Sequence, residues 1–337
     1  MSRTTISTWF VADQPDEQTD FPQVGGRSDS TGFQAVYWRC IACFFASSAK
    51  ANPTAKHAFF TNTVVPTIDG VCIQSVFDAL EVEVINLPIM SRLPKNSVSS
   101  WGNQFYILDV IRYAASHFAD GRLIVLDSDC VLTRDTSELE RAVEENQVLS
   151  YTLYEDQPRD YRVNGVTRPE MAQIANSVFG LNVDFVPYSG GEIFAATISA
   201  CKLMIPYVER LWAYTIVPGQ RLFPREEALF LSIIYAAMFI RDRTANSFIK
   251  RMWTTLSYSN VSAADVSLPI WHLPAEKRSG FQRLFKEIFE NRNKFDSLED
   301  AADLLTLYQR TMGIPRRSVV KLGRDVSAKL TERFANR

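Results

Sequence analysis

Residues 122–132 read R-L-I-V-L-D-S-D-C-V-L, and the fold prediction starts from this stretch. The four apolar residues 123–126 are too few for a helix and are typical of a strand buried on both faces of a sheet. Two carboxylates, Asp127 and Asp129, follow directly, with only Ser128 between them. Open α/β sheets bind ligands at the carboxyl ends of their parallel strands, so we expect both aspartates to lie at a binding site.

The spacing of the two aspartates favours a metal ion. Two carboxylates this close repel each other, and a shared cation removes the repulsion. Carboxylate oxygens suit a hard divalent ion, so Asp127 and Asp129 predict a site for Mn²⁺ or Mg²⁺. The alternative is a strand that runs into an acidic turn without a function.

The chain on either side alternates between strand-like and helix-like patterns. We expect early strands over 6–12, 57–61 and 82–87, and helices over 36–51, 68–80 and 105–118. Later strands are expected over 148–154 and 267–273, with a polar, mobile loop over 155–170 and mainly helix after Pro274. This order predicts right-handed crossovers and an α/β fold, with a Rossmann-like, mostly parallel sheet flanked by helices and a helical C-terminal extension.

The charge and the cysteine distribution of the chain favour some classes of protein over others. The 337 residues are 46% hydrophobic, and the formal net charge of -2 predicts no nucleic-acid partner. The five cysteines are scattered through apolar stretches, a pattern typical of reduced thiols in a cytosolic protein. Cys40 and Cys43 have the C-x-x-C spacing inside an apolar helical run, and we interpret them as core residues.

No targeting signal stands out. The start M-S-R-T-T-I-S-T-W-F is too short and polar for a signal peptide, and the apolar run 228–240 is too short to span a membrane. We therefore expect a soluble, cytoplasmic protein, with peripheral contact to the inner face of a membrane left open.

Three later groups look suited to a site, although each has a plain structural alternative. Gly190 and Gly191 interrupt the strand-like stretch 186–199, which indicates that another group approaches the backbone closely there, or an ordinary bulge. Glu226 and Glu227 open a helix, where acids also favour the positive helix end. His272, between Trp271 and Leu273, could equally be a core histidine.

Together these groups resemble the nucleotide-sugar glycosyltransferases of GT-A type, which have a D-x-D after the fourth strand, a glycine loop, an acidic x-E-D position and a late histidine. The corresponding residues are Asp127-Ser128-Asp129, Ser189-Gly190-Gly191-Glu192, Glu226-Glu227 and His272. The match extends over residues 6–280. It departs from the family pattern at Glu227, where aspartate is usual.

The resemblance implies a metal-dependent enzyme that moves a sugar from a nucleotide-diphosphate donor to a hydroxyl of a glycan, protein or lipid-linked acceptor, in bacterial-type glycan or glycoconjugate synthesis. Asp129 would bind the ion directly, Asp127 would bind it through water or hold the ribose, and His272 would be a third ligand. Lys277 would reach a phosphate oxygen.

Further roles follow from the same chemistry. Gly190 and Gly191 would let the backbone approach the sugar or acceptor, and Glu192 or Glu227 would be the general base. Asp13 and Asn62, at the ends of the first two strands, are candidates for base and ribose contacts or for plain turns.

Two alternatives compete with this interpretation. The stretch 123–132 also resembles the nucleophile motif of haloacid-dehalogenase-type phosphatases, with Asp127 as nucleophile and Asp129 as acid. That motif normally opens its domain, whereas here residues 1–122 precede it, and a downstream lysine followed by a D-D pair is missing. The other alternative is a non-catalytic nucleotide-sugar-binding module.

The expected organisation is a catalytic domain over 1–280, with a nucleotide-binding half (1–150) and an acceptor half (151–280), and a helical extension over 281–337. The tail 316–337 is basic, and apolar residues recur along it at helical spacing: Val319, Leu322, Val326, Leu330 and Phe334. Such an amphipathic helix can lie on an anionic membrane, pack on its own domain, or contact a second subunit in a homo-oligomer.

Overall fold

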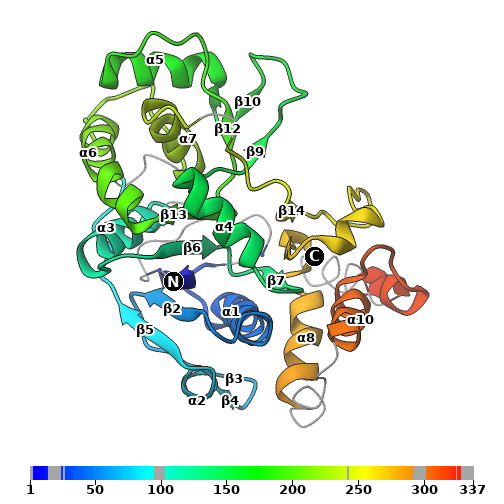
Figure 1. The fold of residues 1–337 in the computed structure, drawn as a ribbon. Coiled ribbons are helices and arrows are strands. Elements are labelled where there is room, and N and C mark those ends of the chain that lie inside the picture. The colour runs from blue at the N-terminus through cyan, green and yellow to red at the C-terminus, as the bar shows by residue number, and fades with distance from the viewer. Residues whose placement is uncertain are drawn as a thin grey trace.

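The computed structural model describes residues 3–13, 24–25, 27–94, 103–240, 243–290, 301–323 and 325–327. A six-stranded sheet with the order β5-β2-β1-β6-β13-β8 forms its centre (Figure 1). The strands are β1 (Thr4–Phe10), β2 (Lys56–Thr61), β5 (Val82–Asn86), β6 (Arg122–Leu126), β13 (Ile193–Thr197) and β8 (Val148–Leu149). The first four are parallel to one another, and β13 is antiparallel to both of its neighbours. The predicted α/β fold with a mostly parallel sheet is confirmed.

The order of the strands indicates where a binding site is expected. From β1 the chain moves outward to β2 and β5, and then returns to the other side of β1 to form β6. The crossover helices are α1 (Thr31–Ala51), α2 (Ile73–Ala79) and α3 (Tyr106–His117). Such a reversal leaves a crevice outside the carboxyl ends of the two central strands, which here are β1 and β6.

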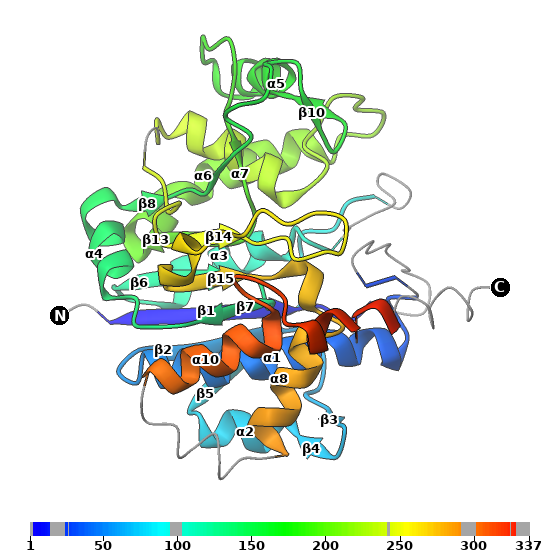
Figure 2. The same cartoon turned by 90° about the vertical axis from the view of Figure 1, so that its right-hand side faces the viewer.

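Helices cover both faces of the sheet and bury a hydrophobic core on each (Figure 2). On one face α1 packs with α8 (Gly280–Phe289) and α10 (Ala301–Met312). The other face carries α3, α5 (Arg168–Phe179), α6 (Ile198–Thr215) and α7 (Glu227–Ala237). Cys40 and Cys43 have no exposed surface and lie in the first core, as predicted.

A second, three-stranded sheet continues from the end of β6. It has the order β14-β15-β7 and consists of β14 (Ile249–Arg251), β15 (Ile270–His272) and β7 (Cys130–Leu132). Because β7 follows the D-x-D directly and pairs antiparallel with β15, His272 is placed opposite Cys130. This pairing brings the late histidine to the acidic pair.

Several local predictions were wrong at turns. The expected helix 68–80 begins with a small hairpin of β3 (Thr67–Ile68) and β4 (Val71–Cys72), because Asp69 and Gly70 both adopt positive φ. The expected strand 148–154 divides into β8 and β9 (Thr152–Leu153), and β9 pairs with β12 (Tyr188–Ser189) instead of joining the central sheet.

The stretch 155–170, expected to be a loop, contains the hairpin of β10 (Arg162–Val163) and β11 (Val166–Thr167). Asn164-Gly165 is a strong hairpin signal that our sequence interpretation overlooked. Helix α5 then begins at a capping box in which Thr167 and Glu170 bond to each other's backbone N–H.

None of the described helices is long and apolar enough to cross a membrane. Of the predicted tail 316–337, residues 324 and 328–337 lie outside the described part of the chain. Within it, Val319, Leu322 and Val326 are exposed, whereas Lys321 is buried. The membrane and subunit contacts proposed for the tail stay predictions.

Candidate active site

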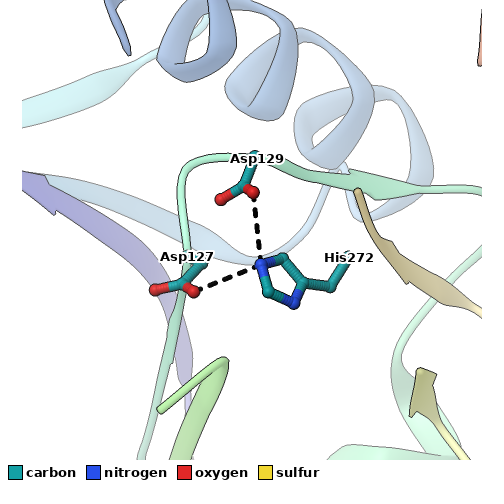
Figure 3. A group of neighbouring side chains, drawn as sticks. All are labelled: Asp127, Asp129 and His272. Carbon is teal, nitrogen blue, oxygen red and sulfur yellow. Dashed lines mark ion pairs between the residues drawn. The ribbon is translucent and has the colours of Figure 1, made fainter. Parts of the chain in front are cut away.

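The D-x-D carboxylates and His272 form one cluster at the carboxyl end of β6 (Figure 3). Nε2 of His272 lies 3.3 Å from Oδ2 of Asp127 and 3.2 Å from Oδ2 of Asp129. Asp129 and His272 are buried, while the Asp127 side chain is 39% exposed. The cluster therefore has a buried back and one accessible carboxylate.

Backbone hydrogen bonds hold the turn that carries the acidic pair. The amide of Asp127 donates to the carbonyl of Glu192 at 3.1 Å, and the amide of Leu273 donates to the carbonyl of Asp129 at 2.9 Å. The first bond ties the turn to β13 and the second ties it to the end of β15. The geometry of the pair is thus determined by strands from distant parts of the sequence.

The donor atoms of the cluster fit a divalent ion. One ligand atom each from Asp127, Asp129 and His272 lies within 4.8 Å of the other two. Both ring nitrogens of His272 are buried without a hydrogen bond in the described part of the chain. Two carboxylates and an imidazole form a donor set that Mn²⁺ accepts readily, and Mg²⁺ prefers the carboxylate oxygens.

The charged groups of the cluster shift one another's pKa values. Burial alone would lower the pKa of His272, but Asp129 and Asp127 outweigh it and hold that pKa well above its usual value. Burial alone would raise the pKa of Asp129, but Lys277 and His272 outweigh it and lower that pKa. The cluster thus favours an ionised Asp129, the form of the carboxylate that can bind a cation.

Lys277 lies inside this cluster. Its Nζ is 2.7 Å from Oδ2 of Asp129 and lies 5.7 Å from the ring centre of Tyr37. Burial alone would lower the pKa of Lys277, but the carboxylate of Asp129 raises it. In this structure the ammonium group therefore holds Asp129, and it also lines the pocket where a phosphate contact was predicted.

Glu192 is buried beneath the cluster and forms an ion pair with Arg251. Its Oε1 lies 3.6 Å from Nδ1 of His272. Burial alone would raise the pKa of Glu192, but Arg251 and His272 outweigh it and lower the pKa to about 2. Our sequence interpretation missed Arg251, which lies in a segment without a recognisable motif and meets His272 only through the pairing of β14 with β15.

Glu226 and Glu227 face the pocket from the start of α7. Burial raises the pKa of Glu226 to about 7, although its hydrogen bond from Asn164 opposes the shift. Burial, with the charges of Glu226 and Asp127, raises the pKa of Glu227 well above its usual value. Oε2 of Glu227 is buried and has no hydrogen-bond partner within the described ranges.

Gly190 and Gly191 make room for two of these carboxylates. A Cβ on Gly190 would collide with Oε2 of Glu192, and one on Gly191 would collide with Oε1 of Glu227. The predicted close approach to this backbone is therefore made, in this structure, by acidic side chains of the protein. Both glycines also line the pocket, where contact with a ligand stays a prediction.

The two strand-end candidates differ in position. Asp13 lines the pocket and accepts hydrogen bonds from Ser28, at 2.5 Å, and from Asn103. Asn62 is not among the described residues that line it, and its amide is paired with the backbone N–H and carbonyl of Ala12 at 2.8 and 3.2 Å. Asn62 therefore holds the turn after β1, and its predicted contact with a base or ribose stays a prediction.

All these groups except Asn62 border one pocket of 330 Å³. It opens at the carboxyl ends of β1 and β6, the point where the strand order reverses. Small-molecule sites in α/β sheets are concentrated at such points.

No protein-family model matches the chain, and no curated protein matches it. Among solved structures, it is similar to the apo-form glycosyltransferase GlyE of Streptococcus pneumoniae TIGR4, with 13% identity and a TM-score of 0.42 over 94% of this chain and 66% of that one. It is also similar to the apo structure of the bifunctional glycosyltransferase WbbM, with 9% identity and a TM-score of 0.46 over 80% of this chain and 45% of that one. The chain thus spans less than two thirds of the length of either structure.

Proposed function

We propose that the protein is a metal-dependent glycosyltransferase, which moves a sugar from a nucleotide-diphosphate donor to a hydroxyl acceptor. The observation that carries the proposal is the convergence of Asp127, Asp129 and His272 in a pocket at the strand-order reversal. The glycine loop and the Glu226-Glu227 pair, which the sequence resemblance singled out, border the same pocket.

Asp127, Asp129 and His272 would hold Mn²⁺ or Mg²⁺, whose charge would neutralise the departing diphosphate. Around these ligands, we assign Lys277 and Glu192 to positioning. Lys277 holds the carboxylate of Asp129, and Glu192 faces the Nδ1 side of His272, the place where metal-binding histidines usually have a carboxylate or carbonyl partner. Because Glu192 is buried and paired with Arg251, it suits this role better than that of general base.

The Glu226-Glu227 pair supplies the general base in this proposal. As the acceptor oxygen attacks the anomeric carbon, its proton passes to a carboxylate of the pair and the nucleotide diphosphate leaves. A base works best when its pKa lies near the working pH, and burial raises the pKa of both glutamates above the usual carboxyl value, that of Glu226 to about 7. We assign the proton transfer to Glu227, because its Oε2 has no hydrogen-bond partner in the described part of the chain. Glu226, which accepts a hydrogen bond from Asn164, is the neighbouring carboxylate that tunes it.

The test is a thermal-shift screen of nucleotide sugars with and without Mn²⁺. A ligand that binds only the folded state raises the melting temperature, and we expect one donor to do so only when Mn²⁺ is present. Asp127→Ala should abolish this shift, because it removes the accessible carboxylate of the cluster.

Asp135→Ala is the matched control, since Asp135 is an exposed acid in the same region and does not line the pocket. The proposal is wrong if no nucleotide sugar stabilises the wild type with Mn²⁺, or if Asp127→Ala keeps the full shift. Metal-dependent hydrolysis of a generic aryl phosphate would point to the phosphatase alternative instead.

A further inference from the structure

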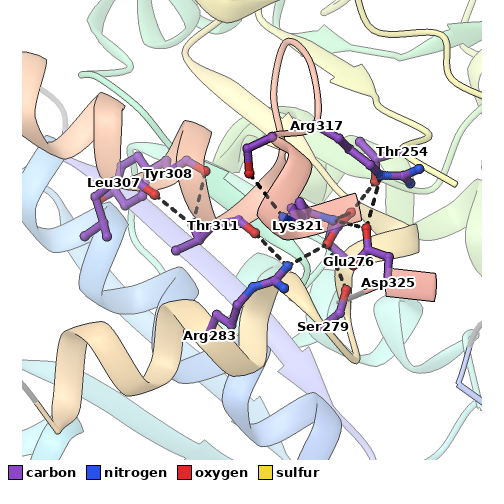
Figure 4. Close-up of polar contacts among 11 residues, drawn as sticks. Thr254, Glu276, Ser279, Arg283, Leu307, Tyr308, Thr311, Arg317, Lys321 and Asp325 are labelled. Atoms are coloured by element: carbon purple, nitrogen blue, oxygen red, sulfur yellow. Dashed lines mark hydrogen bonds and ion pairs between the residues drawn. The ribbon is translucent and has the colours of Figure 1, made fainter. Parts of the chain in front are cut away.

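A buried ion cluster joins the C-terminal segment to the turn that carries Lys277 (Figure 4). Nζ of Lys321 lies 2.9 Å from Oε1 of Glu276 and 2.8 Å from Oδ2 of Asp325. The side chains of Lys321 and Glu276 are each only 2% exposed. An ion pair this deeply buried differs from the surface pairs of the molecule, because losing one partner leaves an uncompensated charge inside the protein.

The carboxylate of Glu276 is held from several sides. Thr254 donates a hydrogen bond of 2.5 Å to Oε1, and Ser279 donates one of 3.0 Å to Oε2. A Cβ on Gly280 would lie 2.6 Å from Oε2, so the glycine allows the carboxylate to fold back over the start of α8. Glu276 therefore has a single well-defined place, and Lys321 is its buried cationic partner.

The same turn reaches the proposed metal site. The short helix η2 (Pro274–Glu276) follows His272 almost directly and is itself followed by Lys277, whose Nζ lies 2.7 Å from Asp129. Adjacent residues of this turn thus point in different directions. Glu276 contacts the C-terminal segment, while Lys277 contacts the D-x-D.

The conformation of the C-terminal segment places Lys321 next to Glu276. It leaves α10 at Gly313, which adopts a positive φ of 74°, and the stem of Lys321 packs where a Gly313 side chain would lie. Asp325 holds Lys321 from the other side and also pairs with Arg317 at 3.1 Å. The basic face of the tail is therefore turned inward at this point.

We propose that Lys321 is a positioning residue of the active site: by fixing Glu276, it fixes the turn 273–279 and with it the contact of Lys277 with Asp129. The consequence for metal and donor binding rests on the proposed function. The claim that Lys321 holds the turn 273–279 in place does not depend on the proposed function. On this view the C-terminal segment is part of the site and not an appendage to it.

The test compares Lys321→Met with Arg310→Met in the full chain. Arg310→Met is the matched control, because it removes an exposed pair between α10 and α8, with Arg310 3.3 Å from Glu287. Hydrogen exchange measured by mass spectrometry should show about tenfold faster exchange over 273–280 in Lys321→Met and no change in Arg310→Met. The reason is that Glu276 loses its nearest cation, and Arg283 remains only at 4.0 Å. Lys321→Arg should restore most of the protection.

The second readout is binding of Mn²⁺ alone, followed by the electron paramagnetic resonance signal of the free ion. Lys321→Met should raise the Kd for Mn²⁺ by about tenfold, the usual effect of disturbing residues behind metal ligands. Failure of the wild type to bind Mn²⁺ would overturn the proposed function, while the exchange experiment would still decide the role of Lys321.

Two results would overturn the inference: unchanged exchange over 273–280 in a folded Lys321→Met protein, or faster exchange with an unchanged Kd for Mn²⁺. If Lys321→Met does not fold, Asp325→Asn takes its place, because it weakens the hold on Lys321 without removing Glu276's partner. About threefold faster exchange in that variant supports the inference, and unchanged exchange overturns it.

Discussion

At the scale of single residues, three carboxylates of the pocket differ in pKa because their neighbours differ. Glu192 has the guanidinium of Arg251 beside it, and its pKa falls to about 2. Desolvation raises the pKa of Glu226 to about 7, and the hydrogen bond from the amide of Asn164 offsets only part of this rise. Desolvation and the neighbouring charge of Glu226 raise the pKa of Glu227 well above its usual value. Carboxyl groups whose environments push their pKa values apart are suited to different roles.

Replacing the proposed base tests this assignment. We expect Glu227→Gln to lower kcat by about 10²–10⁴-fold, the usual contribution of general base catalysis, while donor binding in the thermal-shift assay is kept. Glu138→Gln, on the exposed side of α4 (Ser137–Asn146), is the matched control and should leave kcat unchanged. An unchanged kcat in Glu227→Gln would transfer the role to Glu226.

The pH profile tests the coupling between the two glutamates. A protonated carboxyl cannot accept a proton, so kcat/KM should fall as the pH drops through the raised pKa of Glu227. The charge of Glu226 raises the pKa of Glu227, so Glu226→Gln should move this acid limb to lower pH. A limb that stays in place in Glu226→Gln would show that the pair does not control the rate.

At the scale of secondary-structure elements, the pairing of β7 with β15 builds the site, and the C-terminal segment supports it from outside. In that segment Lys321 points inward, whereas Val319, Leu322 and Val326 are exposed with 85%, 44% and 41% of their surface. The apolar side of this predicted amphipathic helix is thus uncovered over its described part, while a basic residue is buried.

This exposed strip leads to a prediction about membranes. If the tail lies on an anionic bilayer, the full chain should co-sediment with liposomes that contain anionic lipid at low salt, and Leu322→Asp should reduce the pelleted fraction. Leu203→Asp is the matched control, because Leu203 on α6 is 68% exposed and far along the chain from the tail. A full-length protein that stays in the supernatant would contradict membrane binding.

At the scale of the whole molecule, two hydrophobic cores enclose the sheet, and polar groups inside them make stability depend on pH. His57 on β2 is 4% exposed, and its Nε2 lies 2.9 Å from the hydroxyl of Ser48 on α1. Burial lowers the pKa of His57 from 6.5 to about 4. The folded state therefore binds fewer protons than the unfolded state between these two pH values, and the contribution to stability falls as the pH drops from 6.5 towards 4.

Measuring the free energy of unfolding by urea at pH 7 and pH 5 checks this sign. Between pH 7 and pH 5 the free energy of unfolding should fall by about 2 kcal/mol more in the wild type than in His57→Gln. Only the wild type has a buried imidazole that takes up a proton more readily in the unfolded state than in the folded state. His117→Gln is the control, since His117 is exposed and stacks on Tyr113 with the ring centres 4.0 Å apart. Equal losses in the wild type and His57→Gln would contradict the prediction.

The sequence by itself determined the α/β order of the chain and the place of the acidic pair, because apolar runs, helical spacing and turn residues act over a few neighbouring positions. It predicted β6 and Asp127-Ser128-Asp129 at its end, and it singled out His272, Lys277 and Glu227, which border the same pocket. The predictions from sequence were wrong where the geometry of a turn determines the local structure, as at the hairpins around Asp69-Gly70 and Asn164-Gly165.

Only the tertiary structure decided how these groups meet. Lys277 contacts Asp129 across 148 positions of sequence, and Lys321 contacts Glu276 across 45. Arg251, with no motif of its own, becomes the partner of Glu192 because β14 pairs with β15 beside the histidine. Such contacts depend on strand pairing and on the burial of charge, which local pattern does not encode. They determine which carboxylate has a lowered pKa, which has a raised one and which residue holds another in place.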